Sequence, residues 1–222
     1  MKISINQPIT AMIFDLDGVL LSTDRFHFLA WKKLADRLGI CFTEKDNERL
    51  RGVSRMESLE IVLSLAKTPL SLSEEEKINL ATEKNDCYRE YLKTLTPADV
   101  SDEVRDTLAT LRKRGYALAV GSSSKNTRFI LQQTALTDAF DAIADGTDIQ
   151  NSKPDPEVFL KAAGRLGKCP VKCAVIEDSE AGLEAANRVG MLAVAYATAI
   201  DSPLADLRLP AFSDLLFYFP EK

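Results

Sequence analysis

Two aspartates, Asp15 and Asp17, follow an apolar segment at residues 9–14 and are separated by a single leucine. Side chains at i and i+2 of an extended chain point the same way, so both carboxylates can face one ligand. Two carboxylates this close repel each other and an anionic substrate unless a cation lies between them. The pair therefore predicts a nucleophile together with a hard divalent cation. The alternative is a buried strand that merely ends in an Asp-rich turn at Gly18.

Polar side chains also follow three later apolar segments of the chain. Ser122 follows residues 116–120, Lys153 comes after residues 142–144, and Glu177 and Asp178 follow residues 173–176. If these segments are parallel strands, their carboxyl ends meet at one edge of a sheet, where open α/β sheets bind ligands. A carboxylate nucleophile, a hydroxyl, a lysine and an acidic pair suit phosphoryl transfer through an acyl phosphate.

Each of these signals has an ordinary structural alternative. Serines 122–124 could cap a helix, the Lys153-Pro154 pair could lie in a solvated loop, and Glu177 could begin a helix at its favourable end. Their joint placement at successive strand ends favours the functional interpretation.

The elements that would position these residues fall into two kinds. From residue 97 onward apolar strands alternate with helices, which predicts an α/β fold with a Rossmann-like parallel sheet and helices on both faces. Between residues 22 and 93 the apolar spacing is helical throughout, with a helix ending at Gly39 and a capping box at residues 73–76. We therefore expect a core domain (1–21 and 94–222) with an inserted helical cap domain (22–93). Residues 201–222 show no clear pattern.

Composition excludes several functional classes. The formal net charge of −5 gives no basic footprint for nucleic acid, and no apolar run approaches the ~20 residues that a membrane span needs. The first residues lack the apolar centre of a signal peptide. The four cysteines (Cys41, Cys87, Cys169 and Cys173) show no zinc-binding spacing and suit a reducing compartment. We expect a cytoplasmic, monomeric protein that acts on a small molecule.

These motifs resemble those of the haloacid dehalogenase superfamily of phosphotransferases. The four superfamily motifs correspond to residues 15–19, Ser122, Lys153-Pro154 and Glu177-Asp178. Within the superfamily the chain is most similar to the β-phosphoglucomutase family, and that likeness extends into the helical insertion at residues 27–31, 51–55 and 83–86.

The resemblance implies roles for the core residues. Asp15 is the nucleophile and a Mg²⁺ ligand, and Asp17 is the general acid/base and offers its backbone carbonyl to the metal. Asp178 is a further Mg²⁺ ligand with Glu177 beside it. The transferring phosphate is bound by Ser122, Ser123, Ser124, Lys125, Asn126 and Lys153.

The resemblance also implies roles for cap residues. Arg55 and the backbone of Gly52, Val53 and Ser54 would hold a second phosphate, since a guanidinium fork suits phosphate oxygens. Lys84 and Asn85 would contact sugar hydroxyls. His27 would couple cap closure to the acid/base, or would be a satisfied core histidine, and Trp31 would mainly pack the cap.

The implied activity is a Mg²⁺-dependent mutase that interconverts β-glucose 1-phosphate and glucose 6-phosphate through an aspartyl-phosphate and glucose 1,6-bisphosphate. The alternative is a sugar-phosphate phosphatase of the same superfamily, in which water attacks the same phosphoaspartate. A binding protein on an inactive scaffold is a weaker alternative because no catalytic position is missing.

Overall fold

The structure, a computed structural model, describes residues 8–50 and 53–221. The chain divides into two compact units, one made of Met1–Ser22 with Thr96–Lys222 and the other of Thr23–Leu95. We call the first the core unit and the second the cap unit. The insertion was expected at residues 22–93. The cap unit begins one residue later and ends two residues later than that range.

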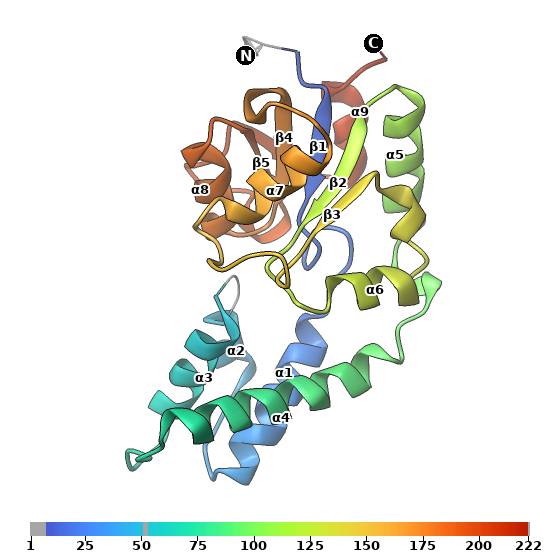
Figure 1. Cartoon of the computed structure of the whole chain (residues 1–222). Helices are drawn as coiled ribbons and strands as arrows, with labels where there is room; N and C mark the ends of the chain where they lie inside the picture. The colour runs from blue at the N-terminus through green and yellow to red at the C-terminus, as the bar shows by residue number, and fades with distance from the viewer. Residues whose placement is uncertain (1–7, 51–52, 222) are drawn as a thin grey trace. The chain divides into compact units, whose positions relative to one another are not determined.

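The core unit contains a six-stranded sheet (Figure 1). Its strands lie in the order β3-β2-β1-β4-β5-β6, and all neighbouring pairs are parallel. This order and direction confirm the predicted Rossmann-like α/β fold. The strands are β1 (Ala11–Phe14), β2 (Ala117–Gly121), β3 (Ala142–Ala144), β4 (Cys173–Glu177), β5 (Leu192–Tyr196) and β6 (Leu207–Leu209).

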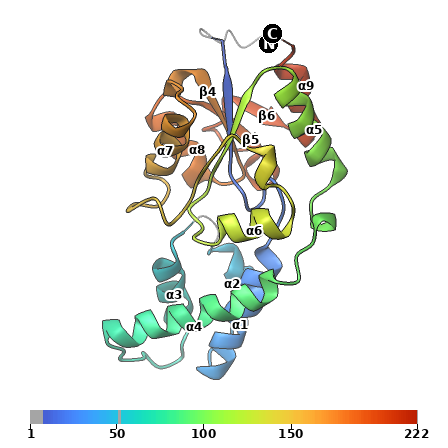
Figure 2. The same cartoon turned by 45° about the vertical axis from the view of Figure 1, so that its right-hand side comes forward.

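Helices cover both faces of this sheet, as Figures 1 and 2 show. On one face α7 (Glu157–Arg165) and α8 (Glu180–Arg188) pack against the strands, in a cluster that includes Ile13 of β1. On the other face lie α5 (Asp102–Lys113) and α9 (Leu215–Tyr218). Phe14 points to this second face, where its ring lies 5.8 Å from that of Phe212 and 6.1 Å from that of Phe140. All four β1 residues are buried because the strand is covered on both faces.

The cap unit is built from helices. They are α1 (Asp24–Arg37), α2 (Glu44–Glu48), α3 (Arg55–Ser64) and α4 (Glu74–Leu92). Capping boxes open three of them, at Thr43, Ser54 and the predicted position Ser73, so each of these helices has a defined first residue. Trp31, Leu59 and neighbouring apolar side chains form the buried centre of the unit.

The C-terminal segment has more structure than its sequence pattern indicated. Residues 201–221 contain the edge strand β6 and the short helix α9, which complete the sheet and cover one of its faces. The helix α6 (Thr127–Gln133) follows the serines at 122–124, after β2. Within the described ranges, no helix combines the length and the apolar character that crossing a membrane requires.

Candidate active site

The carboxyl ends of β1 and β4 meet at the centre of the sheet. Phe14, the last residue of β1, is in register with Ile176 of β4 on one side and Val120 of β2 on the other. The Asp15 amide donates to the Ile176 carbonyl at 3.0 Å and so continues the ladder by one residue. The strand order reverses at β1, and ligands of open α/β sheets bind at such a switch point. Asp15, Glu177 and the end of β2 are therefore adjacent.

Lys153 supplies the positive charge at this switch point. Its ammonium donates to Asp15 Oδ1 and, at 3.3 Å, to Glu177 Oε2, and all three side chains are buried. The Lys153 Nζ also lies 4.7 Å from the ring centre of Phe159 on α7. Burial alone would lower the pKa of Lys153, but the Asp15 and Glu177 carboxylates raise it above its usual value. Lys153 is therefore a fixed cation beside the predicted nucleophile.

Three carboxylates crowd around this single cation. Asp15, Glu177 and Asp178 each place an oxygen within 4.8 Å of the others. Burial, together with the neighbouring acidic groups, raises the pKa of Glu177 and of Asp178 well above the usual carboxyl range. A set of oxygen-only ligands with excess negative charge is the chemistry that Mg²⁺ requires. These residues therefore fit a hard divalent cation.

Gly18 allows the first motif to approach the fourth. Its φ is +80°, and a β-carbon built on it would lie only 2.1 Å from Asp178 Oδ2. Any side chain here would displace the Asp178 carboxylate, so the glycine after Asp17 is a requirement of the acidic cluster as well as of the turn.

The loop after β2 presents hydroxyl and amide groups. The buried Ser122 accepts a hydrogen bond from the Ser124 amide at 3.3 Å, and Ser124 Oγ accepts one from the Asn126 amide at 3.2 Å. The Ser123 hydroxyl is buried and has no hydrogen-bond partner among residues 8–50 and 53–221. The loop is therefore ordered by its own side chains and keeps at least one donor for a ligand. Lys125, by contrast, is exposed.

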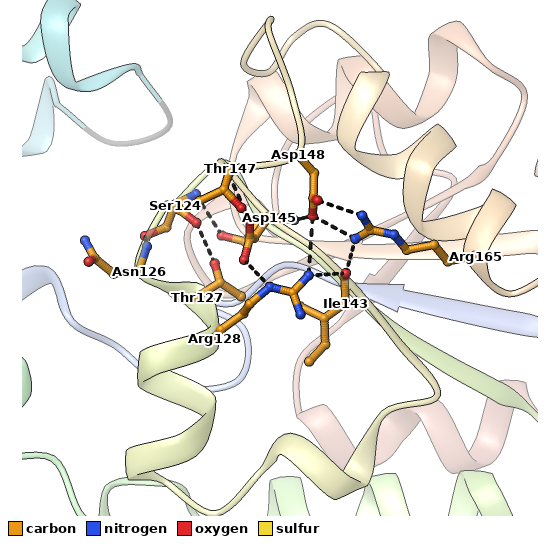
Figure 3. Close-up of polar contacts among 10 residues, drawn as sticks. Ser124, Asn126, Thr127, Arg128, Ile143, Asp145, Thr147, Asp148 and Arg165 are labelled. Carbon is orange, nitrogen blue, oxygen red and sulfur yellow. Dashed lines mark hydrogen bonds and ion pairs between the residues drawn. The ribbon is translucent and has the colours of Figure 1, made fainter.

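An ion-pair network holds this loop against the loop after β3 (Figure 3). The buried Asp145 accepts from the Thr147 amide at 2.9 Å and pairs with Arg128 Nε of α6 at 2.9 Å. Asp148 receives both Nη groups of Arg165 on α7, at 2.6 and 2.7 Å, and this hydrogen bonding lowers the Asp148 pKa. The Gly146 amide donates to the Ser124 carbonyl at 3.1 Å. The serine loop and the loop that leads to Lys153 are thus tied together.

Within the cap unit, α1 and α4 bring the predicted residues His27, Trp31 and Lys84 together with Tyr88. Lys84 is buried, and its Nζ lies 2.9 Å from His27 Nδ1 and 4.6 Å from the ring centre of Trp31. The Tyr88 ring lies 4.0 Å from the His27 ring, and its hydroxyl is 2.8 Å from Thr23 Oγ1. Burial, and then the charges of Lys84 and Arg55, lower the pKa of His27 well below its usual value. His27 is therefore a neutral imidazole that accepts from Lys84.

Arg55 extends this cluster from the first turn of α3. Its Nη2 donates to Asn85 Oδ1 at 2.8 Å. Two carboxylates of the same helix have other partners: Glu57 accepts from the Ser54 amide at 2.9 Å, and Glu60 pairs with Lys77 at 2.7 Å. Burial lowers the pKa of Arg55, and the charge of Asp86 on α4 acts in the opposite direction. The guanidinium is thus hydrogen-bonded to a neutral amide and lies in the field of one carboxylate. Val53 is exposed, and Gly52 lies outside the described residues.

Comparison with known proteins decides the family. Residues 9–190 match the family of haloacid dehalogenase-like hydrolases, which covers most of the chain and includes all four motifs. The chain belongs to this family. The resemblance inferred from the motifs is therefore confirmed, and the chain is a haloacid dehalogenase-like enzyme.

Individual members of the family resemble the chain to different degrees. It is 41% identical to a β-phosphoglucomutase of Bacillus subtilis over 205 residues, which span 92% of this chain and 91% of that protein. The crystal structure of a β-phosphoglucomutase from Clostridium difficile superposes with a TM-score of 0.87, at 37% identity and with 95% of each chain covered. A phosphorylated carbohydrates phosphatase of Thermotoga maritima is 33% identical over 183 residues, 82% of each protein.

Two residues of these sites were not identified from the sequence. Tyr88 lies one helical turn after Lys84 on α4, so the i, i+4 rule could have placed it beside the predicted sugar contact. Thr198 lies after β5 and contacts Asp178 through its hydroxyl. No motif marks Thr198, because only the pairing of β5 with β4 brings it to the acidic cluster.

Proposed function

We propose that this haloacid dehalogenase-like enzyme interconverts β-glucose 1-phosphate and glucose 6-phosphate, with glucose 1,6-bisphosphate as the intermediate. One observation carries the proposal. The cap unit holds its own cationic cluster, Arg55 and Lys84 with His27 and Asn85, in addition to the phosphate-binding residues of the core unit. A bisphosphate carries a second phosphate for such a cluster to bind, whereas a monophosphate held in the core has none. The chain is 41% and 37% identical to two β-phosphoglucomutases, in comparisons that cover more than nine-tenths of it, and this similarity supports the same activity.

In the proposed mechanism, Asp15 carries the transferring phosphoryl group. A sugar hydroxyl attacks the phosphorus of phospho-Asp15 while Asp17 takes the hydroxyl proton, so that the acyl phosphate bond breaks and the bisphosphate forms. The bisphosphate then presents its other phosphate. Asp15 attacks that phosphorus, the sugar oxygen leaves, and Asp17 returns a proton to it. Asp17 thus serves both directions from one position.

The remaining core residues stabilise charge and position the phosphate. Lys153 and the 122–126 loop bind the phosphoryl oxygens, and the Ser123 hydroxyl, which has no partner in the described part of the chain, supplies one donor. We assign a Mg²⁺ site to Asp15, the Asp17 carbonyl and Asp178, with Glu177 beside it. When bound there, Mg²⁺ would neutralise charge on the phosphoryl oxygens.

In the cap unit, Arg55 would bind the second phosphate and Lys84 the sugar hydroxyls. The buried position of Lys84, between His27 and the aromatic rings, holds its ammonium in one place. His27 then acts as the acceptor that orients the Lys84 ammonium, and the Trp31 ring packs against Lys84.

The second candidate is hydrolysis of sugar phosphates, favoured by the similarity to the Thermotoga maritima phosphatase. Water would attack phospho-Asp15 in place of a sugar hydroxyl. The two activities share the core chemistry and differ in their products.

The deciding experiment incubates the enzyme with β-glucose 1-phosphate, Mg²⁺ and a trace of the bisphosphate, and measures glucose 6-phosphate and free phosphate in parallel. Arg55→Ala should cut isomerisation at least roughly tenfold, the effect of losing a charge-assisted contact of about 1.5–3 kcal/mol, and should leave hydrolysis of small phosphate esters unchanged. Arg37→Ala is the matched control, because Arg37 is a cap arginine in an exposed pair with Glu83. Free phosphate as the main product, with isomerisation insensitive to Arg55, would establish the hydrolase instead.

A further inference from the structure

Thr198 contacts both the main chain and the side chain of Asp178. Its hydroxyl donates to the Asp178 carbonyl at 2.6 Å and also lies 3.1 Å from Asp178 Oδ2. The same carboxylate oxygen also lies so close to Gly18 that a β-carbon there could not be accommodated. The Asp178 carboxylate is therefore contacted by the Thr198 hydroxyl and packed against the backbone of the first motif.

The backbone after β5 delivers Thr198 to this position. β5 pairs with β4 so that Ala195 is in register with Glu177, which brings the end of β5 next to Asp178. Ala197 then adopts a φ of +47°, a left-handed conformation that costs about 1–2 kcal/mol for a residue with a β-carbon. The following Ala199 is buried and anchors the turn. A strained residue thus immediately precedes the one whose hydroxyl meets a candidate metal ligand.

We propose that Thr198 is a positioning residue that fixes the Asp178 carboxylate for binding of a divalent cation and thereby sets the affinity of the site. The inference rests on the proposed cation site at Asp15 and Asp178. Groups that hydrogen-bond metal ligands orient them, and their loss commonly weakens metal binding by about 10- to 100-fold. Thr198 is exposed, so we expect the lower end of that range.

The test is calorimetric titration of the metal-free, full-length protein with Mg²⁺ in the absence of substrate. Thr198→Val keeps the shape and the β-branch but removes the hydroxyl, and should weaken Mg²⁺ binding roughly tenfold. Thr198→Ala should lose a similar factor, whereas Thr198→Ser should bind within about twofold of the wild type. The titrations are made at a temperature at which all four metal-free proteins are fully folded by circular dichroism, so a loss of Mg²⁺ affinity in Thr198→Val and Thr198→Ala cannot be caused by unfolding.

Thr94→Val is the matched control. Thr94 is likewise exposed and donates to a main-chain carbonyl, that of Tyr91 at 2.7 Å, but it lies in the cap unit. Its loss should leave Mg²⁺ affinity unchanged. Wild-type affinity in Thr198→Val and Thr198→Ala would overturn the role of Thr198 and leave the cation site standing. A wild-type protein that binds no Mg²⁺ would overturn the cation site and the role of Thr198 with it.

Discussion

Asp15 and Asp17 share a strand end but not an environment. Asp15 is buried under the Lys153 ammonium, whereas Asp17 is half-buried and precedes the turn at Gly18. Leu16 between them is fully buried, as alternation along an extended chain requires. A carboxylate pinned by a lysine suits a nucleophile, and a more accessible one suits proton transfer to changing partners. The two proposed roles follow from this difference.

Asp17→Asn should slow phosphoryl transfer to and from sugar hydroxyls by roughly 10²–10⁴-fold, because the amide cannot move a proton. Phosphorylation of Asp15 from p-nitrophenyl phosphate should suffer far less, since that leaving group needs little protonation. Rapid-quench measurement of both reactions compares the two losses. Equal losses with both donors would argue against Asp17 as the acid.

The neutral state of His27 predicts a pH dependence of cap stability. The folded-state pKa of His27 is lowered below 6.5 by burial and by Lys84 and Arg55. Below about pH 6.5 the unfolded chain therefore binds a proton at His27 that the folded cap does not. Above that pH His27 is neutral in both states, and its full contribution to stability is present. As pH falls below this value the free energy of unfolding should decrease, by at most about 1.4 kcal/mol per pH unit.

Urea unfolding between pH 5 and 8 tests this dependence. Trp31 is the single tryptophan and lies in the cap unit, so its fluorescence follows that unit. His27→Gln, which cannot titrate, should show a smaller loss of stability at acidic pH than the wild type. Parallel curves for the two proteins would contradict the assignment of the slope to His27.

At the scale of elements, two helices of the core unit end in the same hydrogen-bonded turn. The last turn of α5 closes with paired hydrogen bonds, from Gly115 to Arg112 and from Tyr116 to Leu111. The end of α6 makes the same pair, from Ala135 to Gln132 and from Leu136 to Leu131. The motif needs a left-handed residue, and glycine provides it at position 115 with φ +81°. At position 135 an alanine adopts φ +52°.

Ala135→Gly should therefore stabilise the core unit by roughly 0.5–1 kcal/mol, the left-handed strain less the flexibility that glycine adds to the unfolded chain. Gly115→Ala, the reverse change at the equivalent position, should destabilise it by about 1 kcal/mol. Chemical denaturation followed by far-ultraviolet circular dichroism measures both. Shifts of the same sign for the two variants would be inconsistent with this account.

The same elements explain which parts of the fold could be predicted. β1, β2, β4 and β5 are covered on both faces, so they appear as uninterrupted apolar runs. At the ends of β1, β2 and β4 the next residues are polar. β6 was missed because it is a three-residue edge strand, Leu-Arg-Leu, with an exposed centre. Five-residue α2 is too short to show a helical period.

The residues of the candidate sites also differ in whether the sequence could predict their positions. Asp15, Ser122 and Asp178 follow strands directly, so the strand ends alone place them together. Lys153 lies farther along the chain, in the loop after β3. Thr198 depends on the register of β5 and on a left-handed alanine, and neither can be inferred from residue types.

For the whole molecule, the acidic cluster predicts that Mg²⁺ stabilises the folded protein. A ligand that binds only the folded state adds about 2.7 kcal/mol to the free energy of unfolding at a hundred times its dissociation constant. The thermal midpoint should rise with Mg²⁺ beyond any effect of KCl at equal ionic strength. Asp178→Asn should abolish this rise, and Asp102→Asn, at an exposed acid on α5, should retain it. An Mg²⁺ response that survives in Asp178→Asn would place the ion elsewhere.

The position of β1 at the middle of the sheet has a consequence for synthesis on the ribosome. β1 is made first, but its partners β2 and β4 begin only at residues 117 and 173. At about 5–20 residues per second, the strand waits on the order of ten seconds or more for its second neighbour. The cap unit, one unbroken stretch from Thr23 to Leu95, is complete well before then. A nascent chain therefore carries a finished cap and an apolar strand with two open edges, and the acidic cluster of Asp15, Glu177 and Asp178 forms only after Asp178 has emerged.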